Sequence, residues 1–179
     1  MPRSMHNKVV FGAVTILLGA VLVLTGCSRS PLDSSTTVEQ PKVLSRMVDL
    51  SGAALSPVPY HAEAVISAKD GGTLTLLDVT LQIPPGAVPN DTLFSIDIPD
   101  ITVFFNEFGT DGLVFDKPVK VTMSYRGADL SGVNESTIRI GWLNERTGQW
   151  EDMLCTVDTV NQVVTGELNH FSAYGLISD

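Results

Sequence analysis

From Ala62 to the end of the chain, short runs rich in Val, Ile, Thr and aromatic residues recur about every ten residues, with turn residues between them. In residues 119–125 the apolar residues alternate with Lys, Thr and Ser, a period of two that is typical of a half-buried strand. No stretch beyond Ala62 shows sustained helical periodicity. Residues 62–179 are therefore predicted to form one all-β domain, an antiparallel β-sandwich close in size to an immunoglobulin domain.

The turn residues define the individual strands of this predicted domain. Two hairpins are expected near the C-terminus, one pairing residues 137–143 with 149–154 and the other pairing 156–159 with 163–168. The remaining runs predict strands over residues 62–68, 73–77, 79–83, 93–98, 101–105 and 119–125.

The N-terminal residues differ in composition from the predicted domain. Arg3 and Lys8 precede a mostly apolar run, Val9 to Leu24, which is followed by small residues. A basic start, an apolar centre and a small-residue cut site are typical of a secretory signal peptide, here residues 1–26. The alternative is a membrane-spanning helix that stays attached, but such a helix needs about 20 apolar residues and this run is shorter.

The run Leu24-Thr25-Gly26-Cys27 resembles the lipobox of bacterial lipoproteins. The resemblance implies that Cys27 is acylated, becomes the first residue of the mature protein and attaches it to a membrane. Lipoproteins of this kind carry two or three acyl chains, and two or more chains anchor stably. Ser28 stands where the family's inner-membrane retention signal has Asp, which favours the outer membrane of the bacterial cell envelope in a host that has one.

Residues 27–61 are expected to connect the lipidated cysteine to the domain. Residues 28–41 have almost nothing to bury and are typical of a flexible tether. Residues 42–61 are interpreted as a partly ordered lead-in, in which the apolar residues between Val43 and Leu50 favour a short amphipathic helix. The predicted organisation is thus 1–26 signal peptide, 27–61 lipidated cysteine, tether and lead-in, and 62–179 sandwich.

The charge of the mature chain excludes one class of partner. After Cys27, nine Lys and Arg stand against 20 Asp and Glu, which gives a net charge of −11. Nucleic-acid-binding proteins carry basic surfaces, so DNA and RNA are not expected partners. If Cys27 is lipidated, Cys155 has no partner for an internal disulfide. Its strand-like surroundings favour a small buried hydrophobe, with intermolecular pairing or a reactive thiol as the alternatives.

Three segments, in this order along the chain, resemble the ZU-type domain, which is named from zonula occludens proteins and netrin receptors and also occurs in ankyrins. The first is residues 71–89, with the run Ile83-Pro84-Pro85-Gly86-Ala87 at its centre. The second is Gly-Leu-Val-Phe-Asp-Lys-Pro-Val over residues 112–119, and the third is Glu-Leu-Asn-His-Phe-Ser-Ala-Tyr-Gly-Leu over residues 167–176. The resemblance covers residues 71–177 and implies a β-sandwich that serves mainly as an interaction module.

The tripeptide His170-Phe171-Ser172 carries the one specific chemical hypothesis. Some ZU-type proteins cut themselves between the Phe and the Ser of this tripeptide, so the resemblance implies attack of the Ser172 hydroxyl on the Phe171 carbonyl. His170 would accept the hydroxyl proton or steady the developing charge. The alternative is that these residues only form the closing strand of the sandwich.

Trp142 and Trp150 flank the first predicted hairpin, and their even spacing could place them on one face of the sheet. An exposed aromatic pair would suit a carbohydrate, whereas a buried pair would only stabilise the sheet. The loop carboxylates fit no recognised calcium-binding loop, and no metal or cofactor site is predicted.

These observations favour a membrane-anchored lipoprotein whose sandwich acts as a protein-interaction or structural module and is not a conventional enzyme. The alternatives are a self-cleaving domain and a carbohydrate-binding module.

Overall fold

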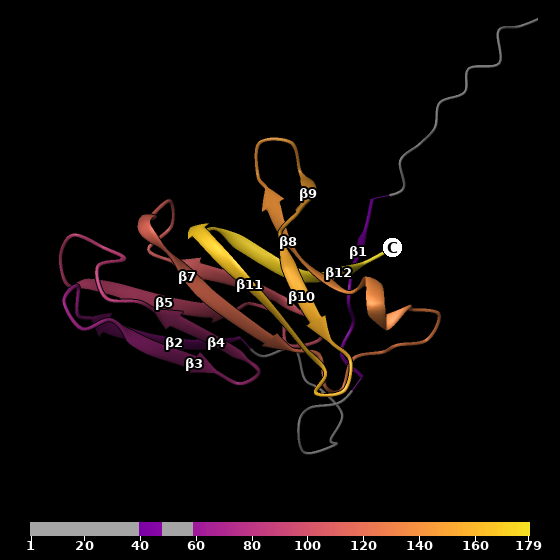
Figure 1. Ribbon diagram of the computed structural model, residues 1–179. Helices are drawn as coiled ribbons and strands as arrows, with labels where there is room; N and C mark the ends of the chain where they lie inside the picture. Colours follow the sequence, from indigo (N-terminus) through magenta and orange to yellow (C-terminus); the bar gives the residue numbers. More distant parts are fainter. Residues whose placement is uncertain (1–39, 48–58) are drawn as a thin grey trace, which may run out of the picture. The chain divides into compact units, whose positions relative to one another are not determined.

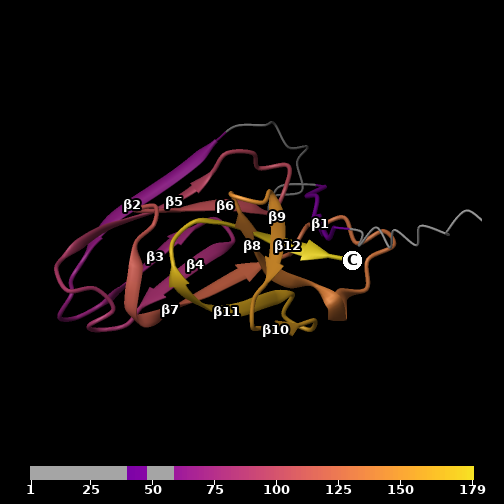
Figure 2. The ribbon, with the colours of Figure 1, turned by 90° about the horizontal axis from the view of Figure 1, so that it is seen from above.

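Two antiparallel β-sheets face each other (Figures 1 and 2). Most of the apolar side chains of the described residues belong to the core cluster or pack against it. The structure, a computed structural model, describes residues 40–47 and 59–179. The seven-stranded sheet contains β1 (Lys42–Val43), β2 (Tyr60–Ile66), β5 (Thr92–Ile98), β6 (Phe105–Gly109), β8 (Arg139–Asn144), β9 (Gln149–Asp152) and β12 (Ala173–Ser178). The five-stranded sheet contains β3 (Gly72–Leu76), β4 (Val79–Ile83), β7 (Val114–Ser124), β10 (Cys155–Asp158) and β11 (Val163–His170).

Each sheet forms one layer of a sandwich and has its own strand order. The order is β2-β5-β6-β12-β8-β9 in the larger sheet, with β1 beside β12, and β10-β11-β7-β4-β3 in the smaller sheet. Figure 2 looks along the gap between the layers, and Figure 1 looks onto the five-stranded sheet. The predicted antiparallel β-sandwich is therefore confirmed.

The core follows from the alternation seen in the sequence. Val119, Val121 and Met123 of β7 are at most 1% exposed, while Lys120 between them is exposed on the outer face. Side chains of successive strand residues point to opposite faces, so this pattern fixes which face of β7 is buried. Apolar side chains of β4, β5, β6 and β8 complete the core from both layers.

Both predicted hairpins form, as β8–β9 and β10–β11. The strand predicted over residues 101–105 is wrong: Ile101 and Phe104 are buried, but they lie in the turn before β6, which begins at Phe105. The strand β2 begins at Tyr60, two residues before the predicted start of the domain.

The segment 40–47 belongs to the sandwich. It is extended, so the helix favoured by the apolar residues of 42–61 is wrong for its described part, and residues 48–58 lie outside the described residues. Leu44 is 3% exposed; its N–H donates to the Leu176 carbonyl at 2.8 Å, and its carbonyl accepts from the Phe104 N–H at 3.0 Å. These bonds add the segment to the edge that β12 offers beyond the end of β6.

A buried ion pair fastens the same segment to the opposite layer. Arg46 Nη2 lies 2.7 Å from Asp78 Oδ2, in the turn between β3 and β4, and the two side chains are 3% and 2% exposed. Arg46 Nε also donates to the Ile101 carbonyl at 3.0 Å, and its guanidinium carbon lies 3.9 Å from the ring centroid of Phe104. Burial raises the pKa of Asp78 and the adjacent Arg46 charge opposes this rise.

Candidate functional site

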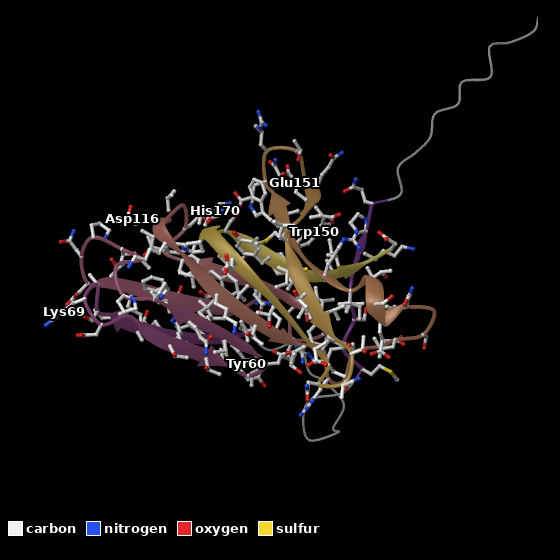
Figure 3. All side chains as sticks on the ribbon, viewed as in Figure 1. Tyr60, Lys69, Asp116, Trp150, Glu151 and His170 are labelled. Carbon is white, nitrogen blue, oxygen red and sulfur yellow. The ribbon has the colours of Figure 1, made fainter. Side chains whose placement is uncertain are left out.

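The tripeptide His170-Phe171-Ser172 lies where the chain passes from one sheet to the other. His170 ends β11 in the five-stranded sheet, and Ala173 begins β12 in the seven-stranded sheet. Phe171 and Ser172 are the two residues of the crossover, so the alternative that the tripeptide only forms the closing strand of the sandwich is wrong. Figure 3 shows His170 at the upper end of β11.

The Phe171 side chain anchors this crossover in the core. It is 1% exposed, and its ring meets three other phenylalanine rings at centroid distances of 5.1 Å (Phe94), 5.7 Å (Phe108) and 4.8 Å (Phe115). Phe94 and Phe108 belong to the seven-stranded sheet, and Phe115 belongs to the five-stranded sheet. The ring therefore joins the two layers at the point where the chain crosses between them.

The Phe171 backbone is held from both sides. Its N–H donates to the Leu113 carbonyl at 2.9 Å, and its carbonyl accepts from the Gly112 N–H at 3.2 Å. His170 Nδ1 lies 3.4 Å from the same carbonyl oxygen. A nucleophile that attacked this carbonyl would place negative charge on an oxygen that already faces a backbone donor, the arrangement found in oxyanion holes.

The neighbours of His170 orient its ring. The Tyr174 hydroxyl donates to the His170 carbonyl at 2.8 Å and lies 3.4 Å from Nδ1. The Trp142 ring makes an edge contact with the imidazole at a centroid distance of 5.0 Å. When Nδ1 carries the proton, it faces the Phe171 carbonyl and the Tyr174 oxygen, and Nε2 keeps the lone pair that can accept a proton. Burial raises the pKa of Tyr174, which keeps its hydroxyl protonated.

The Ser172 hydroxyl is the least defined member of the group. Ser172 is half-buried, and the Ser172 carbonyl accepts a hydrogen bond from the Phe108 N–H at 3.0 Å. Within the described part of the chain, its hydroxyl makes no hydrogen bond. Positive φ among non-glycine residues is found there at Leu77 and Gln162 rather than at the crossover. The structure thus brings an imidazole and a backbone N–H to the Phe171 carbonyl oxygen, and the Ser172 hydroxyl contacts neither of them.

The two tryptophans do not form a pair. In the β8–β9 hairpin Trp142 lies opposite Glu151, and Trp150 lies opposite Leu143. Residues directly opposite one another share a face, so the two indoles lie on opposite faces and the prediction of a shared face is wrong. The Trp142 ring faces the interior beside His170, and its Nε1 is buried with no partner among the described residues.

Trp150 covers the outer face of the seven-stranded sheet. Its ring lies so close to Gly141 and Gly175 that a Cβ at either glycine would come within 3.1 Å and 3.0 Å of indole carbons. It also makes an edge contact with Phe105 at a centroid distance of 6.2 Å. The indole therefore packs directly on the backbone of two neighbouring strands, β8 and β12, at positions where each strand has a glycine.

Cys27 lies outside the described residues. Cys155 is half-buried and packs against the core, and its sulfur accepts from the Ile140 N–H at 3.5 Å. Across residues 40–47 and 59–179, no group of three or more His, Cys, Asp or Glu side chains is placed to hold a metal ion. The same residues include no helix with the length and apolar character needed to cross a membrane.

Sequence reasoning missed Gly112 and Tyr174. Gly112 acts through its backbone N–H, which leaves no signature in the residue type. Tyr174 stands four residues after His170, and its hydroxyl reaches back across the crossover, a contact that the sequence would reveal only if the bend between them were known.

Comparison with known proteins adds no relative: the chain matches no family model and no curated protein.

Proposed function

We propose that this protein is a lipid-anchored component of a bacterial cell envelope and that its β-sandwich is an interaction or structural module held close to the membrane. The basis for the anchor is the signal peptide and the run that ends at Cys27. The observation that carries the proposal is the fastening of the chain that follows the tether. Leu44 and Arg46 are buried within the sandwich, so the chain enters the domain core 17 to 19 positions after Cys27.

The sequence separation limits how far the domain can stand from the lipid. Gln40 is 13 positions after Cys27, and an extended chain spans at most about 3.6 Å per residue, or about 47 Å in total. The sandwich would therefore work within that distance of the membrane surface. The net charge of −11 favours a domain that stands off an anionic surface rather than lying on it.

Metabolic labelling tests the anchor. When the full chain is expressed in a bacterial host with an alkyne-tagged palmitate, we expect the protein to carry the label and to sediment with the membranes. Cys27→Ser should lose both properties, because the acylated thiol is gone. Cys155→Ser is the matched control and should keep both. Membrane association and label that persist in Cys27→Ser would contradict the proposal.

One observation favours self-cleavage as a second candidate function. The Phe171 carbonyl oxygen faces the Gly112 N–H at 3.2 Å and His170 Nδ1 at 3.4 Å. In the reaction the Ser172 oxygen would bond to the Phe171 carbonyl carbon while the hydroxyl proton passed to a base. Breaking the Phe171–Ser172 amide bond, with protonation of the released amine, would leave an ester, and water would hydrolyse it to the Phe171 carboxylate and the free hydroxyl. His170 supplies the base.

If cleavage occurs, the products should stay together in the folded protein. All six residues of β12 are buried, and the strand pairs with β6, β8 and β1. Only a denaturing measurement would therefore separate residues 172–179 from the rest of the chain.

The intact mass of the full chain under denaturing conditions tests this second candidate. We expect the mass to fall by residues 172–179 on incubation, and Ser172→Ala to keep them attached, because alanine has no nucleophile. Tyr174→Phe should slow the loss without abolishing it, since it removes only the contact that orients His170. A wild-type mass that stays whole after long incubation would exclude self-cleavage under those conditions.

A further inference from the structure

The outer face of the five-stranded sheet carries a row of threonines that crosses every strand. The register places one threonine of each strand directly opposite the next, in the order Thr156, Thr165, Thr122, Thr80 and Thr75. Hydroxyl oxygens of neighbouring members lie 3.1 Å apart between Thr75 and Thr80 and 3.5 Å apart between Thr122 and Thr165. The row is thus a line of hydroxyl groups at the spacing of adjacent strands, about 4.8 Å.

A second polar row runs beside the threonines. Glu167, Lys120, Gln82 and Thr73 are opposite one another on four adjacent strands, and all four are exposed. Two open hollows lie along this row, of about 670 Å³ on the β10–β11 side and about 380 Å³ on the β3–β4 side, and Lys120 lines both. We call these hollows and the two rows the polar trough.

The trough is electrically balanced in a strongly acidic protein. Its two charged side chains, Lys120 and Glu167, are direct cross-strand neighbours of opposite sign, whereas the whole chain carries a net charge of −9. An anionic polymer would be repelled by the rest of the protein, and a basic peptide would find stronger partners elsewhere on it. Charge complementarity therefore favours an uncharged occupant.

The lining suits a molecule with hydroxyl groups on its edges and C–H groups on its faces. Thr165, Gln82 and Asn169 offer hydrogen-bond donors and acceptors along the trough. Apolar groups line both hollows, Met153 and Leu154 the hollow on the β10–β11 side and Pro84 and Pro118 the other. Leu154 is 97% exposed, so it forms a rim that nothing in the described structure covers.

We propose that the polar trough binds an extended, uncharged oligosaccharide that lies across the strands of the five-stranded sheet. The trough crosses five strands, a length of about 19 Å at the strand spacing, which accommodates several linked sugar rings. The residues that line the trough belong mostly to hydrogen-bonded strands, so the protein loses little conformational freedom on binding. This inference deepens the proposed interaction module, and it locates a carbohydrate on the opposite sheet from Trp150.

Titration of the full chain, purified in detergent, with hexasaccharides of β-1,4-linked glucose and β-1,4-linked N-acetylglucosamine tests the proposal. We expect at least one of them to bind. The double variant Gln82→Ala/Thr165→Val should lower the affinity at least about tenfold, because it removes two hydrogen-bonding side chains at modest cost to packing. Thr159→Val, in the β10–β11 turn outside the trough, is the matched control and should bind like the wild type.

Two outcomes would overturn the proposal: no binding of either hexasaccharide, or equal affinity in the double variant and the wild type. Unchanged circular dichroism and melting temperature in the variants would exclude unfolding as the cause of a loss. The experiment does not depend on lipidation, so failure of the anchor and failure of the trough are distinguishable.

Discussion

Arg46→Ala is expected to lower the free energy of unfolding by about 3–5 kcal/mol, since removing one member of a buried ion pair leaves the other charge buried and uncompensated. The side chain of Asp78 is 2% exposed, and its Oδ1 has no partner among the described residues, so Arg46 is its principal source of stabilisation. The substitution also removes the bond to the Ile101 carbonyl and the contact with Phe104. Urea denaturation of the full chain at neutral pH measures the loss.

A double variant and the pH dependence provide the controls. Arg46→Met/Asp78→Leu removes both charges and should recover most of the lost stability. In Arg46→Ala, burial without the opposing charge raises the pKa of Asp78 further above its unfolded value. The folded state then binds the proton more tightly than the unfolded state, so the stability of this variant relative to the wild type should rise as the pH falls toward 4. A loss below about 1 kcal/mol, the range of an exposed pair, would contradict this account.

Phe171→Ala is expected to lower the free energy of unfolding by about 3–5 kcal/mol, the usual cost of deleting a fully buried phenylalanine ring. The ring is 1% exposed and contacts phenylalanines from both sheets, so its removal leaves a cavity at the crossover. Guanidinium denaturation measures the change.

Phe171→Leu should cost far less because it retains most of the volume. Phe105→Ala is a second comparison, since this half-buried ring packs on the outer face beside Trp150. If Phe171→Ala and Phe105→Ala cost the same, the Phe171 ring does not hold the crossover in the way described here.

The parts of the fold that the sequence predicts well are those in which pairing is local. The β8–β9 and β10–β11 hairpins join neighbouring segments, and their turns contain Gly148 and Asn161. The alternation in β7 identifies its buried face because one side packs on the core and the other faces solvent. Both signals lie within a few residues of the feature that they predict.

The parts that the sequence does not predict depend on distant segments. The strands predicted from the sequence leave residues 106–109 unassigned, yet these residues belong to β6 because β5 and β12 pair with it on either side. The apolar residues before β6 instead turn beneath the segment that contains Leu44 and Arg46. The partner of Arg46 is 32 residues away, a separation at which the sequence gives no indication of contact.

The candidate sites, too, combine features that the sequence predicts with features that depend on distant segments. The tripeptide at residues 170–172 is recognisable in the sequence, but alternation alone places it within a strand, whereas the register shift after Leu168 and the change of sheet place it in a crossover. Each threonine of the polar trough has an ordinary strand propensity. Their alignment exists only in the register of five strands, and two of the four pairings, β11–β7 and β7–β4, join segments about 40 residues apart.

The intact mass of the full-length gene product, extracted from the membranes of a bacterial host and denatured, tests whether Cys27 carries the proposed lipid anchor. We expect a chain that begins at Cys27 and carries the added mass of two or three acyl chains. A soluble or membrane-bound product that retains residues 1–26, or that begins at another residue without added lipid, would contradict it.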